Sequence, residues 1–252
     1  MPRNAHAAVL LPTEAGSSYH RMLIYGGSSP DDGAFNDVFI LQIPLTTANN
    51  EEVGEKEPLR WEKLERCSGE KPEARELHCA TLLPSTSSIC FSGGRNFDGN
   101  ICTDMAILDF KAWEWQLVPI CEWNRCSHVA GLIDGALVSF GGFDGGAIRN
   151  DCWVYHDDAE SWLQANTDDH SGEGEQDPRN SHDKTDRSKI SSAAPTVLER
   201  FGHAGCTVVL TSPASSSSAA SDKDKVSKQA LLVFGGMNAS NDLNDLVLIE
   251  QR

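Results

Sequence analysis

Residues 130–162 read AGLIDGALVSFGGFDGGAIRNDCWVYHDDAESW, and this stretch decides the fold. An apolar run leads into Gly141-Gly142, the polar pair Asn150-Asp151 follows, and Trp162 closes the stretch. The same order returns, with losses, three more times in the 252 residues. Regular self-similarity of this kind indicates a repeat architecture, in which each unit stacks on its neighbours.

Every repeat contains a glycine pair, a polar pair after it and an Arg-x-x-His step ahead of it. The glycine pairs are Gly26-Gly27, Gly93-Gly94, Gly141-Gly142 and Gly235-Gly236, and the polar pairs are Asn36-Asp37, Thr103-Asp104, Asn150-Asp151 and Asn244-Asp245. The Arg-x-x-His steps are Arg3/His6, Arg75/His78, Arg125/His128 and Arg200/His203, and the tryptophans that follow are Trp61, Trp115 and Trp162. Glycine tolerates positive φ and close approach, Asn or Asp can cap turns, and tryptophan offers a large packing surface, so all these duties are structural.

Each repeat also predicts short β-strands joined by turns. The predicted strands are 7–11, 21–25, 38–41 and 61–64, then 79–83, 89–91, 105–109 and 115–118, then 128–133, 136–140, 152–155 and a run from Trp162, and finally 204–210, 231–234 and 246–249. A tryptophan-led fourth strand is missing after Ile249. An acidic stretch at 46–57 interrupts the first repeat. We expect a disordered acidic insertion at 165–194, because it has too few apolar side chains to offset the entropy of ordering, and a low-complexity loop at 211–229.

The combination of glycine pair, Asn-Asp and spaced tryptophan resembles the kelch repeat. The segment Gly69-x-x-Pro72-x-x-Arg75-x-x-His78 is also similar to a kelch subclass with a Pro-x-x-Arg-x-x-His entry. The resemblance implies an all-β fold, a kelch-type β-propeller in which each repeat forms one blade, a four-stranded antiparallel meander. We therefore expect a single domain of about four blades over residues 1–252. The blades should lie near 3–66, 75–120, 125–164 and 200–252.

Two departures from the repeat pattern bear on whether the propeller closes. Ser92 stands where Tyr25, Phe140 and Phe234 place an aromatic residue before the glycine pair. No spare terminal strand is evident to latch a ring, although propellers usually close with 4–8 blades to protect their sheet edges. Three explanations stay open: a truncated product, an open four-bladed arc completed by another copy, or a very small ring.

Charge and composition narrow the class of partner. The formal net charge of −16 argues against nucleic acid or anionic lipid, since both require a positive surface. The sequence starts without an apolar signal region and has no membrane-length apolar stretch, which predicts a cytoplasmic protein, with the nucleus as an alternative. Eight cysteines occur without a Cys-x-x-Cys pair, so we interpret them as reduced, small hydrophobic residues.

Neither a metal centre nor a catalytic site is indicated. The histidines of the four steps are better explained by one structural duty repeated four times than by a metal ring. His156, His170 and His182 lack metal-ligand spacing. The sequence also lacks a Gly-x-Ser-x-Gly elbow, a Walker loop and a His-Glu-x-x-His motif. We expect no cofactor, no metal and no catalytic residue, so an enzyme is unsupported.

A candidate site follows from strand direction. Turns in an antiparallel meander alternate between its two ends, so the turns after the glycine pairs share one rim. On this rim we expect a partner to contact Arg95, Asn96, Phe97, Asp98, Phe143, Asp144, Arg149, Met237 and Asn238. Phe97 and Phe143 each precede Asp-Gly, and with arginine and carboxylates around them they have the composition of a contact hot spot. The alternative is that each ring folds back onto its own blade.

The leading functional hypothesis is therefore a kelch-repeat protein–protein interaction module, a scaffold or adaptor that binds a protein partner through these rim loops. Kelch propellers commonly bind peptides or proteins on this rim, which the resemblance implies without assigning any residue. One alternative is a small-molecule enzyme that uses the propeller mouth. Another is a fragment of a larger multidomain kelch protein.

Overall fold

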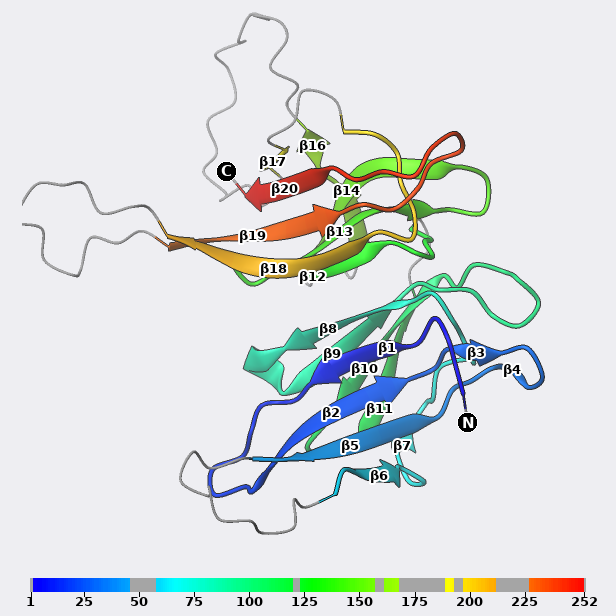
Figure 1. The fold of residues 1–252 in the computed structure, drawn as a ribbon, viewed down its shortest axis with the longest axis vertical. Coiled ribbons are helices and arrows are strands. Elements are labelled where there is room, and N and C mark those ends of the chain that lie inside the picture. Colours follow the sequence, from blue (N-terminus) through cyan, green and yellow to red (C-terminus); the bar gives the residue numbers. More distant parts are fainter. Residues whose placement is uncertain are drawn as a thin grey trace, which may run out of the picture. The chain divides into compact units, whose positions relative to one another are not determined.

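The computed structural model describes residues 2–45, 58–119, 123–156, 161–167, 189–192, 197–211 and 227–251 (Figure 1). The chain divides into two compact units, Met1–Ser127 and His128–Arg252, which we describe separately. Strands dominate both units, and the helical structure in the described ranges is the 3-10 turn η1 (Pro84–Thr86). The all-β prediction is confirmed.

The first unit contains two blades (Figure 1). Blade 1 is the antiparallel sheet of β1 (Ala7–Leu10), β2 (Tyr19–Tyr25), β5 (Val38–Pro44) and β6 (Arg60–Lys63), in that order. Blade 2 contains β8 (Cys79–Leu83), β9 (Ser88–Ser92), β10 (Asp104–Asp109) and β11 (Glu114–Pro119), with β7 (Ser68–Gly69) parallel to β11 at the outer edge. A small hairpin of β3 (Ser28–Ser29) and β4 (Gly33–Ala34) extends from blade 1.

The second unit also contains two blades. Blade 3 is the sheet of β12 (Val129–Ile133), β13 (Ala136–Phe143), β14 (Ile148–His156) and β15 (Ser161–Gln164). Blade 4 is the sheet of β18 (Ala204–Thr211), β19 (Ser227–Phe234) and β20 (Leu246–Gln251), continued by β17 (Lys189–Ser192) and β16 (Asn166–Thr167). Each strand predicted from the sequence has its counterpart here, and the four antiparallel sheets are those expected of kelch blades.

The fourth strand of blade 4 comes from an unexpected place. The outer position, which should hold a strand after Ile249, is occupied by β17, which pairs antiparallel with β20. β17 precedes the rest of blade 4 in sequence and lies inside the segment 165–194, as does β16. Two short parts of this segment therefore form strands, through backbone pairing of β16 with β17 and of β17 with β20. Residues 168–188 lie outside the described residues, as do 46–57 and 212–226.

A cluster of aromatic rings fills the core between blades 1 and 2. The Tyr25 ring lies 4.8 Å from the Phe91 ring and 5.2 Å from the Trp115 ring, measured between centroids. All three residues are buried, and they belong to one apolar cluster with residues of β1, β2, β5, β9 and β10. Tilted aromatic pairs of this kind contribute about 0.5–1.5 kcal/mol each beyond the apolar area that they bury.

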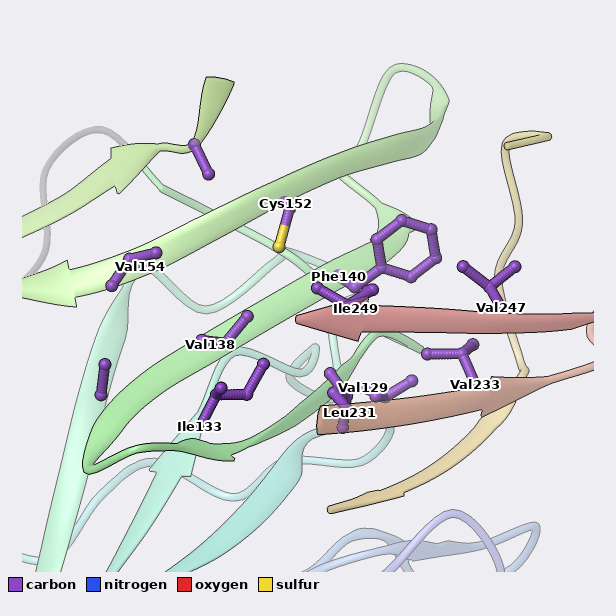
Figure 2. Packing of buried hydrophobic residues seen from close by; sticks show 12 residues of the cluster. Val129, Ile133, Val138, Phe140, Cys152, Val154, Leu231, Val233, Val247 and Ile249 are labelled. Atoms are coloured by element: carbon purple, nitrogen blue, oxygen red, sulfur yellow. The ribbon is translucent and has the colours of Figure 1, made fainter. Parts of the chain in front are cut away.

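The core of the second unit is aliphatic with one phenylalanine. Figure 2 shows Phe140, Cys152 and Val154 of blade 3 on one side of this core and Val247 and Ile249 of blade 4 on the other. Cys152 and Val154 alternate along β14 with more exposed positions, whereas β13 is buried on both faces from Ala136 to Gly142. The buried face of β14 belongs to the same apolar cluster as β20, so each blade of this unit needs its neighbour to cover that face.

The arginine of an Arg-x-x-His step forms an ion pair with the aspartate of the polar pair in the same blade. Arg75 donates to the Asp104 carboxylate at 2.7 Å and to the Gly93 carbonyl oxygen at 3.2 Å. Arg200 makes the same contacts with Asp245 and with the glycine carbonyl of its own blade. Asp104 and Asp245 are therefore counter-ions for buried arginines, a role beyond the turn capping that the sequence suggested.

Three of the step histidines, His78, His128 and His203, are buried, whereas His6 is exposed. Burial lowers the pKa of His78 to about 3, and the charge of Arg75 acts in the same direction. Burial also lowers the pKa of His203 to about 4. No group of three or more His, Cys, Asp or Glu side chains among the described residues could hold a metal ion. The positions of the described step histidines fit a structural duty.

A buried neutral histidine makes stability depend on pH. In the unfolded chain a histidine titrates near pH 6.5, whereas His78 in the fold stays neutral down to much lower pH. Its contribution is therefore complete above about pH 6.5 and is lost as the pH falls, at about 1.4 kcal/mol per pH unit. Urea unfolding measured at several pH values between about 6.5 and 5 should show this slope. His78→Phe should reduce it, and an unchanged slope would contradict the assignment.

The three tryptophans of the repeats do not share one environment. Trp115 and Trp162 are each 2% exposed, as expected of packing residues. Trp61 is 58% exposed, with its ring edge toward Phe39 at a centroid distance of 6.5 Å. Trp61 therefore differs from the other two tryptophans, and its ring contacts Phe39 of its own sheet. The seven described cysteines are free, and most of them are partly or fully buried.

Candidate partner-binding site

A groove of about 360 Å³ opens in the first unit between the turns that follow two glycine pairs. Blade 1 contributes the β3–β4 hairpin, and blade 2 contributes the turn after Gly94. The groove is lined by Ser28, Ser29, Gly33, Ala34, Glu76, Arg95, Asn96, Phe97, Asp98 and Gly99. The structure thus brings together the four candidate residues predicted in repeat two, and it adds a wall from blade 1.

Phe97 is the most exposed large apolar side chain in this groove. It is 77% exposed, and its ring edge lies over Gly33 of the neighbouring hairpin, where an added Cβ would come within 2.4 Å of Cδ2. The ring does not fold back onto its own blade, as one reading of the sequence had it. A ring held over the hairpin of another blade, with most of its surface in solvent, is available to a partner.

A charged network of three residues lines the groove. Arg95 Nε donates to Glu76 Oε1 at 2.7 Å, and the Ser28 hydroxyl donates to the other oxygen of the same carboxylate. Partial burial alone would raise the pKa of Glu76, but the Ser28 and Arg95 contacts lower it below its usual range. The Arg95 guanidinium is half-exposed, so it retains free donors toward the solvent.

Asn96 has a different role from the one predicted. Its side-chain oxygen accepts from the Asn100 N–H at 3.0 Å, and its side-chain amide donates to Glu73 at 2.9 Å. Both ends of the amide are therefore used to hold the turn. Asn96 lines the groove and holds its turn, and a contact role for it stays a prediction.

The same turn-holding role recurs in the second unit. Asn238 Oδ1 accepts from the N–H groups of Ser240 and Asn241, both at 2.9 Å. Asp144 Oδ1 accepts from Gly146 N–H at 2.8 Å and from Ala147 N–H at 2.7 Å. The second residue after each of these glycine pairs is thus a turn cap, which explains why short polar side chains recur there.

The side chains of Asp144 and Arg149 form an ion pair with each other. Partial burial would raise the pKa of Asp144, but the two backbone N–H groups and the Arg149 guanidinium lower it to about 2. Arg149 Nε donates to Asp144 Oδ2 at 2.6 Å. This pair closes the β13–β14 hairpin, so Asp144 is a structural residue in the fold.

Phe143 and Phe97 are not equivalent, although each precedes Asp-Gly. Phe143 pairs with Ile148 in the β13–β14 ladder and is half-buried, whereas Phe97 stands at the tip of its turn. Met237 forms a bridge with Phe201 and is 43% exposed. In the first unit, four of the candidates line the groove: Arg95, Asn96, Phe97 and Asp98. A contact role for the candidates of the second unit stays a prediction.

Sequence reasoning missed the residues that blade 1 contributes. Ser28 and Gly33 lie after the glycine pair of blade 1, in a segment that the repeat pattern marks only as a loop, and Glu76 of blade 2 lies inside the Arg75/His78 step. The sequence did contain one indication that Ser28 belongs to the site. Ser28 follows its glycine pair directly, as Arg95 does in the next repeat. The bridges Asn4–Ser28 and Glu76–Arg95 confirm this equivalence.

These sheets, glycine pairs and paired Arg-x-x-His steps define a kelch-type repeat protein. The description "KLHDC2/KLHL20/DRC7 Kelch-repeats domain" names the family model that matches residues 53–190. Because the match covers more than half of the chain, the protein belongs to this kelch-repeat family.

One curated relative is similar over a large part of the chain. It is "Tip elongation aberrant protein 1" of Schizosaccharomyces pombe, which is 30% identical over 162 residues. The match covers 62% of this chain and 12% of that protein, so the chain spans a small part of its relative's length. Membership of the kelch family supports a protein-interaction module. Among the described residues, no helix has the length and apolar character to cross a membrane.

Proposed function

We propose that the protein is an interaction module that binds a protein partner in the groove between the β3–β4 hairpin and the turn after Gly94. The observation that carries the proposal is Phe97, a large apolar side chain that is mostly exposed above a groove lined by two blades. A role as scaffold or adaptor, in the cytoplasm or nucleus, belongs to this proposal.

The chemistry of the groove favours a short peptide segment as ligand. Phe97 offers an apolar anchor, and Arg95 keeps donors free while Glu76 holds it in place. Ser29 and the backbone of the hairpin add polar groups to the opposite wall. Aromatic residues and arginine are common among the few residues that carry most of the binding energy in protein interfaces.

Replacing Phe97 with alanine tests the proposal. Loss of a central aromatic anchor costs about 2 kcal/mol or more, so we expect the affinity for the partner to fall by about 30-fold. The partner would first be identified with the wild-type protein by affinity purification and mass spectrometry. Its dissociation constant would then be measured against both proteins by calorimetry.

Leu59→Ala is a matched control, because Leu59 is an exposed large apolar residue of the same unit that does not line the groove. It should leave the affinity unchanged. Both side chains are largely exposed, so neither substitution should change the free energy of unfolding by more than about 0.5 kcal/mol. If Phe97→Ala, combined with Arg95→Glu, retains every partner at full affinity, the groove is not the binding site.

A further inference from the structure

The charged side chains that line the groove of the first unit are mostly negative. Glu76 and Asp98 line the groove, and the cation that lines it, Arg95, is paired with Glu76 at 2.7 Å. Asp98 is exposed, and among the described residues no hydrogen bond or ion pair holds its carboxylate. The Asp98 carboxylate is therefore open to a ligand.

Three more carboxylates surround these lining residues. Asp32 Oδ2 accepts from the Ser29 hydroxyl at 3.0 Å, and Ser29 lines the groove. Glu73 Oε1 accepts from the side-chain amide of Asn96 at 2.9 Å, and Asn96 also lines the groove. Asp31 is exposed in the turn that joins β3 to β4. The negative charge thus extends over both walls of the groove.

Two other arginines of these blades do not offset this charge. Arg3 is paired with Asp37 at 2.6 Å, and its side chain is 9% exposed. Arg75 is paired with Asp104 at 2.7 Å, and its side chain is fully buried. The groove and its surroundings therefore hold five carboxylates and one guanidinium. A negative potential of this kind favours a ligand with positive side chains.

Phe97 provides an aromatic surface beside this negative charge. Its side chain is 77% exposed, and the edge of its ring lies over Gly33. The face of an aromatic ring attracts a cation within about 6 Å of the ring centroid. The methylene groups of an arginine or lysine side chain can cover the ring at the same time. Asp98 follows Phe97 directly, so the same turn supplies a ring and a counter-ion.

The first unit already holds one of its own arginines in this way. The Cζ atom of Arg3 lies 4.5 Å from the centroid of the Phe35 ring. The Asp37 carboxylate accepts two hydrogen bonds from the same guanidinium. Phe97 and Asp98 offer the same two kinds of group to an arginine from another molecule.

We propose that the partner enters the groove with a basic peptide segment, and that an arginine of this segment lies on the Phe97 ring and pairs with Asp98. The inference rests on the proposed function and names the chemistry of its ligand. The outward donors of Arg95 then bind a backbone carbonyl oxygen of the peptide. An acidic peptide would instead bring its carboxylates close to five others.

A side chain suits this site better than a metal ion does. No group of three or more His, Cys, Asp or Glu side chains in the part of the chain that the structure describes could hold a metal ion. The carboxylates are spread along two walls, which suits a peptide with more than one positive charge.

Three matched peptides test the charge of the ligand. They share a Gly-Ser frame with two leucines and differ only in the central pair, which is Arg-Arg, Gln-Gln or Glu-Glu. Fluorescence anisotropy of each labelled peptide gives its affinity. The wild type should bind the Arg-Arg peptide on the order of 10-fold more tightly than the Gln-Gln peptide, and the Glu-Glu peptide most weakly. Raising the salt from about 0.01 M to about 1 M shortens the Debye length about 10-fold, so the preference should shrink.

Three variants separate the groove from the overall negative charge. Phe97→Leu keeps an apolar side chain without an aromatic face, so it should lower the preference for Arg-Arg over Gln-Gln by about 3-fold. Asp98→Asn should lower the same preference by about 3-fold. Glu114→Gln is the matched control, because it removes an exposed carboxylate at the opposite end of blade 2, in the β10–β11 hairpin. It should leave the preference unchanged.

A wild-type protein that prefers the Gln-Gln or Glu-Glu peptide, or binds none of the three, would overturn the inference. So would a preference for Arg-Arg that Phe97→Leu and Asp98→Asn leave intact, because the overall charge would then be its cause. The proposed function has a separate readout, the affinity of the purified partner for Phe97→Ala. A partner that needs Phe97 but binds through a neutral or acidic segment would refute the basic ligand and leave the groove as the binding site.

Discussion

Asp104→Ala is expected to lower the free energy of unfolding of the first unit by about 3–5 kcal/mol. Arg75 is fully buried, and Asp104 is the carboxylate that pairs with it, at 2.7 Å. Removing one partner of a buried ion pair leaves an uncompensated charge, which is much more costly than replacing both partners. Urea unfolding followed by circular dichroism would measure the loss.

Two further variants show whether charge is the cause. Asp104→Asn keeps a hydrogen-bond acceptor near Arg75 and removes the charge, so its loss should be smaller but still measurable. Asp245→Ala makes the same change in blade 4, where the aspartate side chain is 48% exposed, compared with 25% for Asp104. Water can partly replace the more exposed carboxylate, so Asp245→Ala should cost less. Equal losses at the two sites would contradict this account.

The fold could be predicted because its determinants are local and repeated. Glycines such as Gly141, with positive φ, and apolar runs such as 136–140 mark strand ends and strand interiors directly. The outer strand of blade 4 could not be predicted in this way. β17 has few apolar side chains, and its place is set by backbone pairing with β20, which leaves no periodic signal in the sequence.

The candidate site was predicted in part, for a similar reason. The turn after Gly94 follows from strand direction, so Arg95 and Phe97 could be placed on a rim. The roles of Asn96 and Asp144 depend on which groups their side chains reach, and a polar residue in a turn looks the same whether it caps the turn or contacts a partner. The wall from blade 1 depends on how two blades meet, which a single repeat does not encode.

Gly26→Ala is expected to destabilise the first unit by about 3–5 kcal/mol. Gly26 has a φ of 64°, so any side chain strains the backbone. The added Cβ would also lie 2.6 Å from the Arg75 carbonyl oxygen and 2.8 Å from His78 Cε1. Neither neighbour can move easily, because one is backbone and the other is a buried ring. Chemical denaturation would give the loss of free energy.

Gly235→Ala is the matched control, since Gly235 has nearly the same φ, 67°, but lacks neighbours from a following blade. Its cost at low protein concentration should be the backbone strain alone, about 1–2 kcal/mol. The difference between the two substitutions then measures the close approach of one blade to the next. If Gly235→Ala costs as much as Gly26→Ala in dilute solution, the close approach to Arg75 and His78 is not the cause.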